Sequence, residues 1–183
     1  MMLKFSNMHN FLFYKFIPYR FYSAIYLFIL FSIVACGGNK NISDEGDFSE
    51  LKELVESGDF EIQNDWAFPN NSNNINLIGN PNHLIFKNDS VDIFLPYFGV
   101  RHAGGNYADT EGGIVYSGPL NDLEKDVNET KGIILIKFRG MRNGEIMNFD
   151  VTLYPNKKAR TRVVSTQRTP ISYEGKYRSS EDL

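Results

Sequence analysis

The chain has 183 residues, a formal net charge of −3 at neutral pH, a hydrophobic fraction of 42% and a charged fraction of 22%. These fractions are close to the globular average, which excludes a wholly disordered chain, and the length fits one domain. The single Cys excludes an internal disulfide and a multi-cysteine zinc site, and the acidic balance gives no reason to expect nucleic-acid binding.

The N-terminal segment has the pattern of an export signal. Residues 1–35 contain three basic and no acidic side chains, and residues 21–35 form an uncharged, mostly apolar run of fifteen residues. A signal-peptide core uses about 7–15 apolar residues, whereas a bilayer-spanning helix needs about 20. We therefore expect a signal peptide over residues 1–35 rather than a permanent anchor helix, and its start is either Met1 or Met8.

The apolar run closes on residues 33–38 (IVACGG), which resemble the bacterial lipoprotein signal. In that signal, the cysteine after a small residue is acylated and becomes the mature N-terminus. Cys36 is therefore the expected lipidation site, and its acyl chains would tether the protein to a membrane without spanning it. We expect a cell-envelope location, anchored to the outer membrane and facing either the periplasm or the cell surface.

The segment after Cys36 changes from a polar tether to a single domain. Residues 36–46 are small, polar and acidic, which is typical of a flexible linker. Residues 48–57 then place Phe48, Leu51, Leu54 and Val55 at helical spacing before Gly58, which predicts an amphipathic helix. Its apolar stripe would cap the open end of a β structure. We expect the domain over residues 47–178 and a disordered tail over 179–183.

Short strands with turns between them follow the helix. In the first strand, Phe60, Ile62, Trp66 and Phe68 share one parity, so we expect them on one face. The next two strands flank Asn88-Asp89, and a two-residue turn there sets Phe86 opposite Val91 and Leu84 opposite Ile93.

The C-terminal half allows a more detailed register. Strands at 133–139 and 145–153 flank Asn143-Gly144, a strong hairpin signal that sets Phe138 opposite Phe149 on an apolar face. A three-residue turn at 155–157 then continues the pattern into a further strand. This register predicts a cross-strand ladder on the outer face, formed by Lys137, Asp150 and Arg162.

A final strand at 170–177 brings the total to eight or nine strands and one short N-terminal helix. The consecutive hairpins favour a mainly β fold, an antiparallel meander that closes as a β-barrel. A two-sheet β-sandwich is the alternative.

Three segments resemble the domain-of-unknown-function family 4251, which comprises lipoproteins and secreted proteins of Gram-negative bacteria. They are residues 89–99 (DSVDIFLPYFG), 112–119 (GGIVYSGP) and 171–175 (ISYEG). The resemblance runs from about Leu51 to Tyr177 and implies a lipocalin-like β-barrel. It brings no established activity, so no catalytic residue is transferred. Asp89-Ser90-Val91 also resembles an O-glycosylation motif of some of these bacteria, which makes Ser90 a candidate modification site.

Motifs for catalysis are missing from the sequence. Acylation of Cys36 would leave no cysteine nucleophile, neither His83 nor His102 lies in a zinc-helix motif, and no serine lies in a nucleophile elbow. Residues 99–104 lack the Lys-Ser/Thr of a phosphate loop. We therefore expect no enzymatic activity, no metal and no cofactor.

Two groups of polar residues remain as candidates. Residues 97–113 are long for a connection in a small domain, and we expect them to form either a solvated loop or a ligand or partner loop. The residues that would converge there are Arg101, His102, Tyr107, Asp109 and Glu111. Basic residues gather near the C-terminus as a possible anion-attracting patch, or simply as partners for the acidic N-terminal half; they are Lys157, Lys158, Arg160, Arg162 and Arg168.

Two functional hypotheses follow. The first is a membrane-anchored lipoprotein that acts as a non-enzymatic interaction or structural module, with a filled core and an unknown protein partner. The alternative is a barrel that binds a small molecule, a lipid or a glycan, in an apolar cavity. The interior discriminates between them, because a barrel filled by Phe86, Phe138, Phe149 and Trp66 would leave no room for a ligand.

Overall fold

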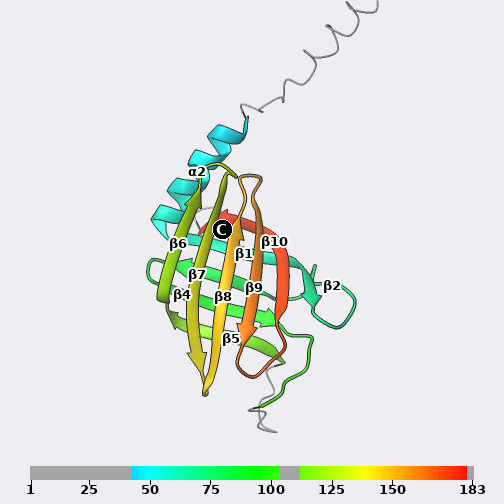
Figure 1. Ribbon diagram of the computed structural model, residues 1–183. Helices are drawn as coiled ribbons and strands as arrows, with labels where there is room; N and C mark the ends of the chain where they lie inside the picture. The colour runs from blue at the N-terminus through cyan, green and yellow to red at the C-terminus, as the bar shows by residue number, and fades with distance from the viewer. Residues whose placement is uncertain (1–42, 104–111, 181–183) are drawn as a thin grey trace, which may run out of the picture. The chain divides into compact units, whose positions relative to one another are not determined.

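One helix and ten strands make up the part of the chain that the computed structural model describes, residues 43–103 and 112–180. All of these residues belong to one unit, Asn41–Leu183 (Figure 1). In chain order the elements are α2 (Ser43–Ser57), β1 (Asp59–Pro69), β2 (Ile75–Asn76), β3 (His83–Lys87), β4 (Ser90–Pro96), β5 (Gly113–Pro119), β6 (Asn121–Asn128), β7 (Ile133–Arg142), β8 (Glu145–Leu153), β9 (Lys158–Ser165) and β10 (Ile171–Ser179).

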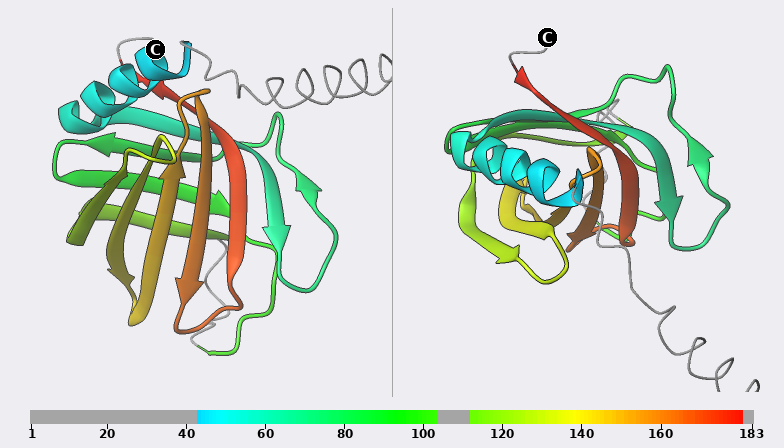
Figure 2. Two further views of the ribbon diagram at one scale, coloured as in Figure 1. Left: turned by 45° about the horizontal axis from the view of Figure 1, so that its top comes forward. Right: turned by 90° about the horizontal axis from the view of Figure 1, so that it is seen from above.

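The strands form a single antiparallel sheet in the order β5-β4-β3-β1-β10-β9-β8-β7-β6, and the short β2 pairs with β1. The two end strands, β5 and β6, are separated in the chain by Leu120 alone. This tight corner brings the two ends of the sheet together, and the sheet curls into a nearly closed barrel (Figure 2). The expected barrel is confirmed, and the sandwich is excluded because one hydrogen-bonded order links all nine main strands.

The predicted hairpins have the predicted registers. Phe86 pairs with Val91 across the Asn88-Asp89 turn, and Phe138 pairs with Phe149 across the Asn143-Gly144 turn. Asn143 and Gly144 have φ values of 51° and 78°, as a type I′ turn requires. Turn chemistry and alternation of apolar residues agree at these sites, so the local sequence is sufficient to set the pairing.

The predicted ladder is correct in register but only partly correct in its ion pairs. Asp150 lies between Lys137 and Arg162 on the outer face, and its carboxylate Oδ2 is 3.8 Å from Arg162 Nη1. Lys137 Nζ instead lies 3.4 Å from the carboxylate of Glu124, on β6. The sequence pattern did not place β6 beside β7, so this competing partner was missed. These exposed pairs contribute about 0–1 kcal/mol each.

The expected face of the first strand is wrong beyond its midpoint. Phe60 and Ile62 are buried, but Trp66 is 40% exposed and Ala67 takes the inward position. The β1–β10 register shifts between Asn64 and Trp66, which indicates a β-bulge. One extra residue reverses the parity of everything that follows, so Trp66 points away from the core.

Five aromatic rings form a continuous chain across the interior. The centroid distances are 4.4 Å for Phe60–Phe86, 5.8 Å for Phe86–Phe138, 4.8 Å for Phe138–Phe149 and 6.4 Å for Phe149–Tyr116. The rings come from β1, β3, β7, β8 and β5, so they join opposite sides of the barrel. Contacts at these distances combine burial of apolar surface with favourable ring geometry.

Helix α2 covers one open end of the barrel, as expected (Figure 2, right). Phe48, Leu51 and Val55 are buried in the core, and the helix ends before Gly58, whose φ of +68° favours glycine. The helix begins at Ser43, so its first turn lies within the range expected to be tether.

Gly175 permits the close approach of β10 to the bulged part of β1. A Cβ atom at this position would overlap the carbonyl oxygen of Gln63 and the Cα of Asn64, which are both backbone atoms. Any larger residue would therefore force the two strands apart. This contact explains a glycine in one of the segments on which the family resemblance rests.

We predict that Gly175→Ala lowers the free energy of unfolding by about 3 kcal/mol, because backbone atoms cannot move aside as a flexible side chain would. Urea unfolding of the mature chain carrying Cys36→Ser measures the effect. Gly112→Ala is the control, since no atom lies within 4 Å of a Cβ built there. Equal unfolding midpoints for the two variants would contradict the prediction.

Candidate functional site

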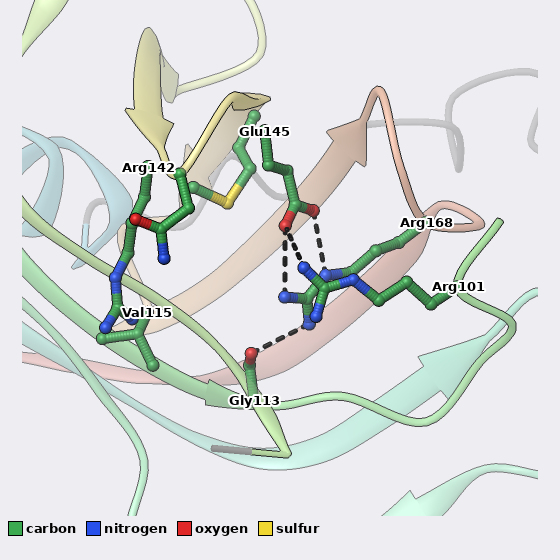
Figure 3. A pocket seen from close by; sticks show the side chains of 8 residues that line it. Arg101, Gly113, Val115, Arg142, Glu145 and Arg168 are labelled. Atoms are coloured by element: carbon green, nitrogen blue, oxygen red, sulfur yellow. Dashed lines mark hydrogen bonds and ion pairs between the residues drawn. The ribbon is translucent and has the colours of Figure 1, made fainter. Parts of the chain in front are cut away.

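A buried ion pair lies at the end of the barrel opposite helix α2. Glu145 is the first residue of β8, directly after the Asn143-Gly144 turn, and Arg168 lies in the connection between β9 and β10. The Arg168 Nε and Nη2 atoms donate to the two Glu145 carboxylate oxygens at 2.9 and 3.2 Å (Figure 3). The two side chains are only 10% and 5% exposed, so this bidentate pair is largely removed from water.

Further donors and acceptors complete the network around the pair. The Ser165 hydroxyl donates to Glu145 Oε1, and Arg168 Nη1 donates to the Gly113 carbonyl at 2.8 Å. Arg101 Nη2 lies 3.6 Å from Glu145 Oε2. A buried pair stabilises a fold only when its remaining hydrogen-bonding groups are satisfied. Here the hydrogen bonds and ion pairs that satisfy these groups connect β5, β8, the end of β9 and the segment after β4.

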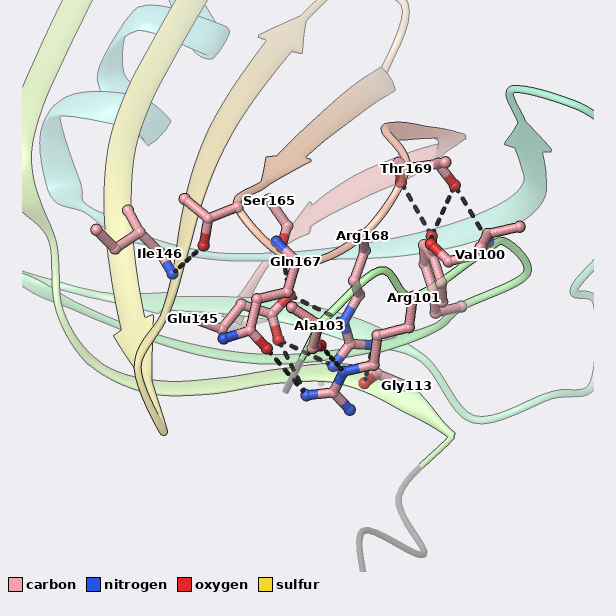
Figure 4. A network of polar contacts seen from close by, with 12 residues as sticks. Val100, Arg101, Ala103, Gly113, Glu145, Ile146, Ser165, Gln167, Arg168 and Thr169 are labelled. Atoms are coloured by element: carbon pink, nitrogen blue, oxygen red, sulfur yellow. Dashed lines mark hydrogen bonds and ion pairs between the residues drawn. The ribbon is translucent and has the colours of Figure 1, made fainter. Parts of the chain in front are cut away.

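The segment after β4 pairs with the β9–β10 connection through its backbone (Figure 4). Thr169 N–H donates to the Val100 carbonyl at 3.0 Å, and His102 N–H donates to the Gln167 carbonyl at 2.7 Å. Arg101 and Arg168 form an antiparallel bridge between these bonds. Residues 97–103 are thus held against another segment, which differs from the solvated loop considered from the sequence.

Two tyrosines add contacts between the segment after β4 and the strand β10 end of the barrel. The Tyr97 ring lies 5.1 Å from the guanidinium carbon of Arg168, and its hydroxyl is 2.8 Å from Thr169 Oγ1. The Tyr173 hydroxyl donates to the Pro96 carbonyl at 2.8 Å. Burial raises the pKa of Tyr173 above its ordinary value, and the nearby positive charge of Arg168 acts in the opposite direction. Tyr173 is therefore neutral at physiological pH and serves as a hydrogen-bond donor.

Of the five predicted loop residues, the structure describes two. The Arg101 side chain joins the Glu145–Arg168 network, whereas His102 is exposed and contributes its backbone N–H. Tyr107, Asp109 and Glu111 lie outside the described residues.

The structure describes one of the two candidate modification sites, Ser90. Ser90 is exposed at the first residue of β4, where its hydroxyl donates to the Lys87 carbonyl at 2.9 Å. Cys36 lies outside the described residues.

The expected anion-attracting patch is wrong for Arg168, which is buried and paired with Glu145 rather than displayed on the surface. Other members of that group face acidic residues as well. Lys157 lies 3.4 Å from Glu50, Arg160 lies 3.8 Å from Glu174, and Arg162 pairs with Asp150. Lys157–Glu50 joins the acidic and the basic half of the chain, whereas the other pairs lie within the basic half.

Glu145, Ser165 and Gly113 are the members of the network that sequence reasoning missed. Glu145 follows a turn and reads as an exposed strand end, and its partner Arg168 is 23 positions away. Alternation did offer one signal, because Glu145 shares its parity with the inward-facing Met147 and Phe149. An acidic residue on an inward position requires a buried partner.

Within residues 43–103 and 112–180, no three His, Cys, Asp or Glu side chains gather as a metal site. No helix in the same part of the chain is long and apolar enough to cross a membrane. The Glu145 carboxylate is enclosed by two guanidinium groups and a hydroxyl, an arrangement suited to fixing the rim and recognising charge.

We predict that Glu145→Gln costs about 3 kcal/mol in the free energy of unfolding, because it leaves the Arg168 charge buried without its counter-ion. Glu174→Gln is the matched control: it removes a carboxylate from an exposed pair and should cost about 0–1 kcal/mol. Urea unfolding measures both variants. Equal losses would show that the buried network contributes no more to the free energy of unfolding than an exposed ion pair does. In the double variant Glu145→Gln/Arg168→Gln, the loss should be smaller than the sum of the single losses.

Comparison with known proteins agrees with the fold. A solved structure of a DUF4251 family protein from Bacteroides eggerthii superimposes with a TM-score of 0.56 at 13% identity, covering 75% of this chain and 90% of that one. No curated protein matches the sequence. The profile of the family described as a domain of unknown function (DUF4251) matches residues 43–177, which include every strand up to most of β10. The chain therefore belongs to the DUF4251 family.

Proposed function

We propose that this protein is a lipid-anchored, non-enzymatic interaction module of the bacterial cell envelope, and that its folded domain acts through its surface. The observation that carries this proposal is the filled interior. Phe86, Phe138 and Phe149, three of the four side chains expected to decide the matter, are buried and in contact with one another. The fourth, Trp66, lies outside the core.

The filled interior argues against the small-molecule barrel. The aromatic chain from Phe60 to Tyr116 occupies the space between opposite walls, and α2 covers one end with Leu51 and Val55. The Glu145–Arg168 network lies at the other end. A lipid or glycan would need a cavity of several hundred Å³ with apolar lining. The contacts across this barrel favour a packed core over a ligand-binding cavity.

Exposed apolar side chains support action through the surface. Met141 and Ile146 face each other across the end of the β7–β8 hairpin and are 67% and 36% exposed. Val100 is exposed in the segment that pairs with the β9–β10 connection. Apolar groups gathered at one end of a soluble domain are typical of protein contact surfaces.

The anchor is proposed from the sequence around Cys36. If Cys36 is acylated, only residues 37–42 separate the lipid from the first residue of α2. Six residues span at most about 20 Å when fully extended. The domain would therefore work within a short distance of the membrane surface, with α2 near the anchored end of the chain.

Cys36→Ser tests the anchor. We predict that it moves the protein from the membrane fraction to the soluble fraction and abolishes metabolic labelling with a radioactive fatty acid, since the acyl chains supply the membrane affinity. Ser43→Ala is the control and should remain in the membrane fraction with its label. A Cys36→Ser protein that stays in the membrane fraction would refute lipid anchoring through this residue.

Native mass spectrometry of the mature Cys36→Ser chain, exported and purified from its own host, tests the choice between surface and cavity. We predict the mass of the polypeptide without a non-covalent ligand, because the interior is occupied by side chains. A reproducible extra mass that is lost on denaturation would select the small-molecule barrel instead. An extra mass that survives denaturation would indicate covalent modification, and its loss in Ser90→Ala would assign it to Ser90.

Crosslinking in cells tests the surface itself. The double variant Met141→Ser/Ile146→Ser should lose specific adducts of the anchored protein, because it removes the exposed apolar pair. Val127→Ser changes an exposed apolar residue on β6 and should retain them. Identical adducts in both variants would exclude the hairpin end as the contact surface.

A further inference from the structure

A hollow lies on the outer face of the barrel, over the neighbouring strands β8, β9 and β10 (Figure 1). Its volume is about 260 Å³, which is room for one sugar-sized ring. Ala159 and Gly175 pair with each other at buried positions, which leaves a gap between the outward side chains on either side of them. The side chains around this gap are aromatic, amide or charged: Tyr154, Asn156, Lys158, Arg160 and Glu174.

The outward position of Trp66 extends this hollow by one strand. Trp66 pairs with Glu174 across β1 and β10, and Glu174 pairs with Arg160 across β10 and β9. The bulge in β1 directs the indole to this face, where it is 40% exposed. A bulge that re-aims a side chain is a recurring feature beside functional sites. Trp66 therefore gives the outer face an aromatic ring that the core does not use.

Tyr154 provides a second aromatic ring, on β8. Its backbone N–H donates to the Lys158 carbonyl at 3.0 Å, which places it beside Lys158 on the wall of the hollow. Strands β1, β10, β9 and β8 are consecutive in the sheet, and three strand spacings amount to about 14 Å. The row of side chains from Trp66 through Glu174, Arg160 and Lys158 to Tyr154, here called the outer strip, is therefore longer than one sugar ring.

The polar groups of the outer strip contact one another and are still open to solvent. Arg160 Nε lies 3.8 Å from Glu174 Oε1, and the two side chains are 55% and 51% exposed. Asn156 Oδ1 accepts a hydrogen bond from Lys158 N–H at 3.3 Å, which fixes the orientation of its amide. Groups that are already ordered lose less conformational entropy on binding. The outer strip therefore offers hydrogen-bonding groups that a ligand can reach.

The combination of aromatic rings and charged groups fits a carbohydrate. A guanidinium group offers paired donors, and a carboxylate offers paired acceptors. Neighbouring hydroxyls on a sugar ring can both donate and accept, so they match either group. The apolar C–H face of the same sugar packs against an indole or phenol ring. A lipid chain would instead need a continuous apolar lining, which the charged side chains of this hollow interrupt.

We propose that the outer strip binds an oligosaccharide, which stacks on Trp66 and Tyr154 and forms hydrogen bonds with Arg160 and Glu174. This binding goes beyond the protein contact proposed above, because it uses a different surface from the β7–β8 hairpin end. It also needs no cavity inside the barrel. An open strip of this kind holds its ligand weakly, so the purified chain keeps the bare polypeptide mass that is expected in native mass spectrometry.

Fluorescence of Trp66 tests the proposal directly, because it is the single tryptophan of the chain. The mature Cys36→Ser chain is titrated at constant ionic strength with cellotetraose, chitotetraose and tetragalacturonate, and with the monosaccharide of each. We expect a saturable change in fluorescence with at least one tetrasaccharide, since stacking replaces water around the indole. The matching monosaccharide should bind about tenfold more weakly or worse, because it cannot reach both aromatic rings. The probe that binds most tightly shows whether the ligand is a neutral or an acidic sugar.

Two arginine variants on β9 locate the site. Arg160→Gln should weaken binding about tenfold, because it removes a charged hydrogen-bond donor. Arg162→Gln is the matched control: Arg162 is also 55% exposed and lies 3.8 Å from a carboxylate on the neighbouring strand, but it does not line the hollow. If Arg160→Gln alters the urea midpoint, Lys158→Gln replaces it as the test variant. Fluorescence that does not saturate with any probe, monosaccharides that bind as tightly as tetrasaccharides, or equal weakening by both arginine variants would overturn the proposal.

Discussion

The bidentate contact between Glu145 and Arg168 determines how the segments at one end of this barrel pack together. Two opposite charges that are removed from water lose their hydration energy, which hydrogen bonds within the protein must replace. If one hydrogen-bonding partner is missing, the buried pair destabilises the fold. Ser165, Gly113 and Arg101 supply those partners. Each is on a different segment, so the same requirement that satisfies the charges also fixes where β5, the end of β9 and the chain after β4 lie. These contacts hold the rim segments to one another.

The opposite end and the interior are stabilised by apolar packing instead of buried charges. There the chain buries apolar surface, with α2 laid over the opening and aromatic rings stacked from wall to wall. The contrast separates the molecule into a packed body and a charged, partly apolar rim. The body is packed with buried aromatic side chains, and this moves attention to the rim. Guanidinium groups and exposed apolar side chains are gathered there on a fixed frame.

The charge distribution has a related explanation. The acidic N-terminal half and the basic C-terminal half of the domain meet across the barrel, where pairs such as Lys157–Glu50 and Arg178–Glu61 form. Most of these pairs are exposed and contribute little energy individually. Of the basic residues that look like one anion-binding surface in the sequence, Lys157 is paired in this way, whereas Arg160 and Arg162 pair with carboxylates of their own half.

Local sequence was sufficient for the helix and the hairpin registers, because turn residues such as Asn143-Gly144 and the two-residue alternation act over neighbouring positions. It favoured a barrel but left a sandwich open. It failed at Trp66, since a bulge inserts one residue without a signal in the composition and reverses the face of the strand. The candidate site was only partly accessible: Arg101 was singled out, but its joining of Glu145 and Arg168 was not. Contacts between residues 23 or more positions apart depend on how the sheet curls and which strands become neighbours. That curvature arises from packing of the whole barrel, and only the tertiary structure decides it.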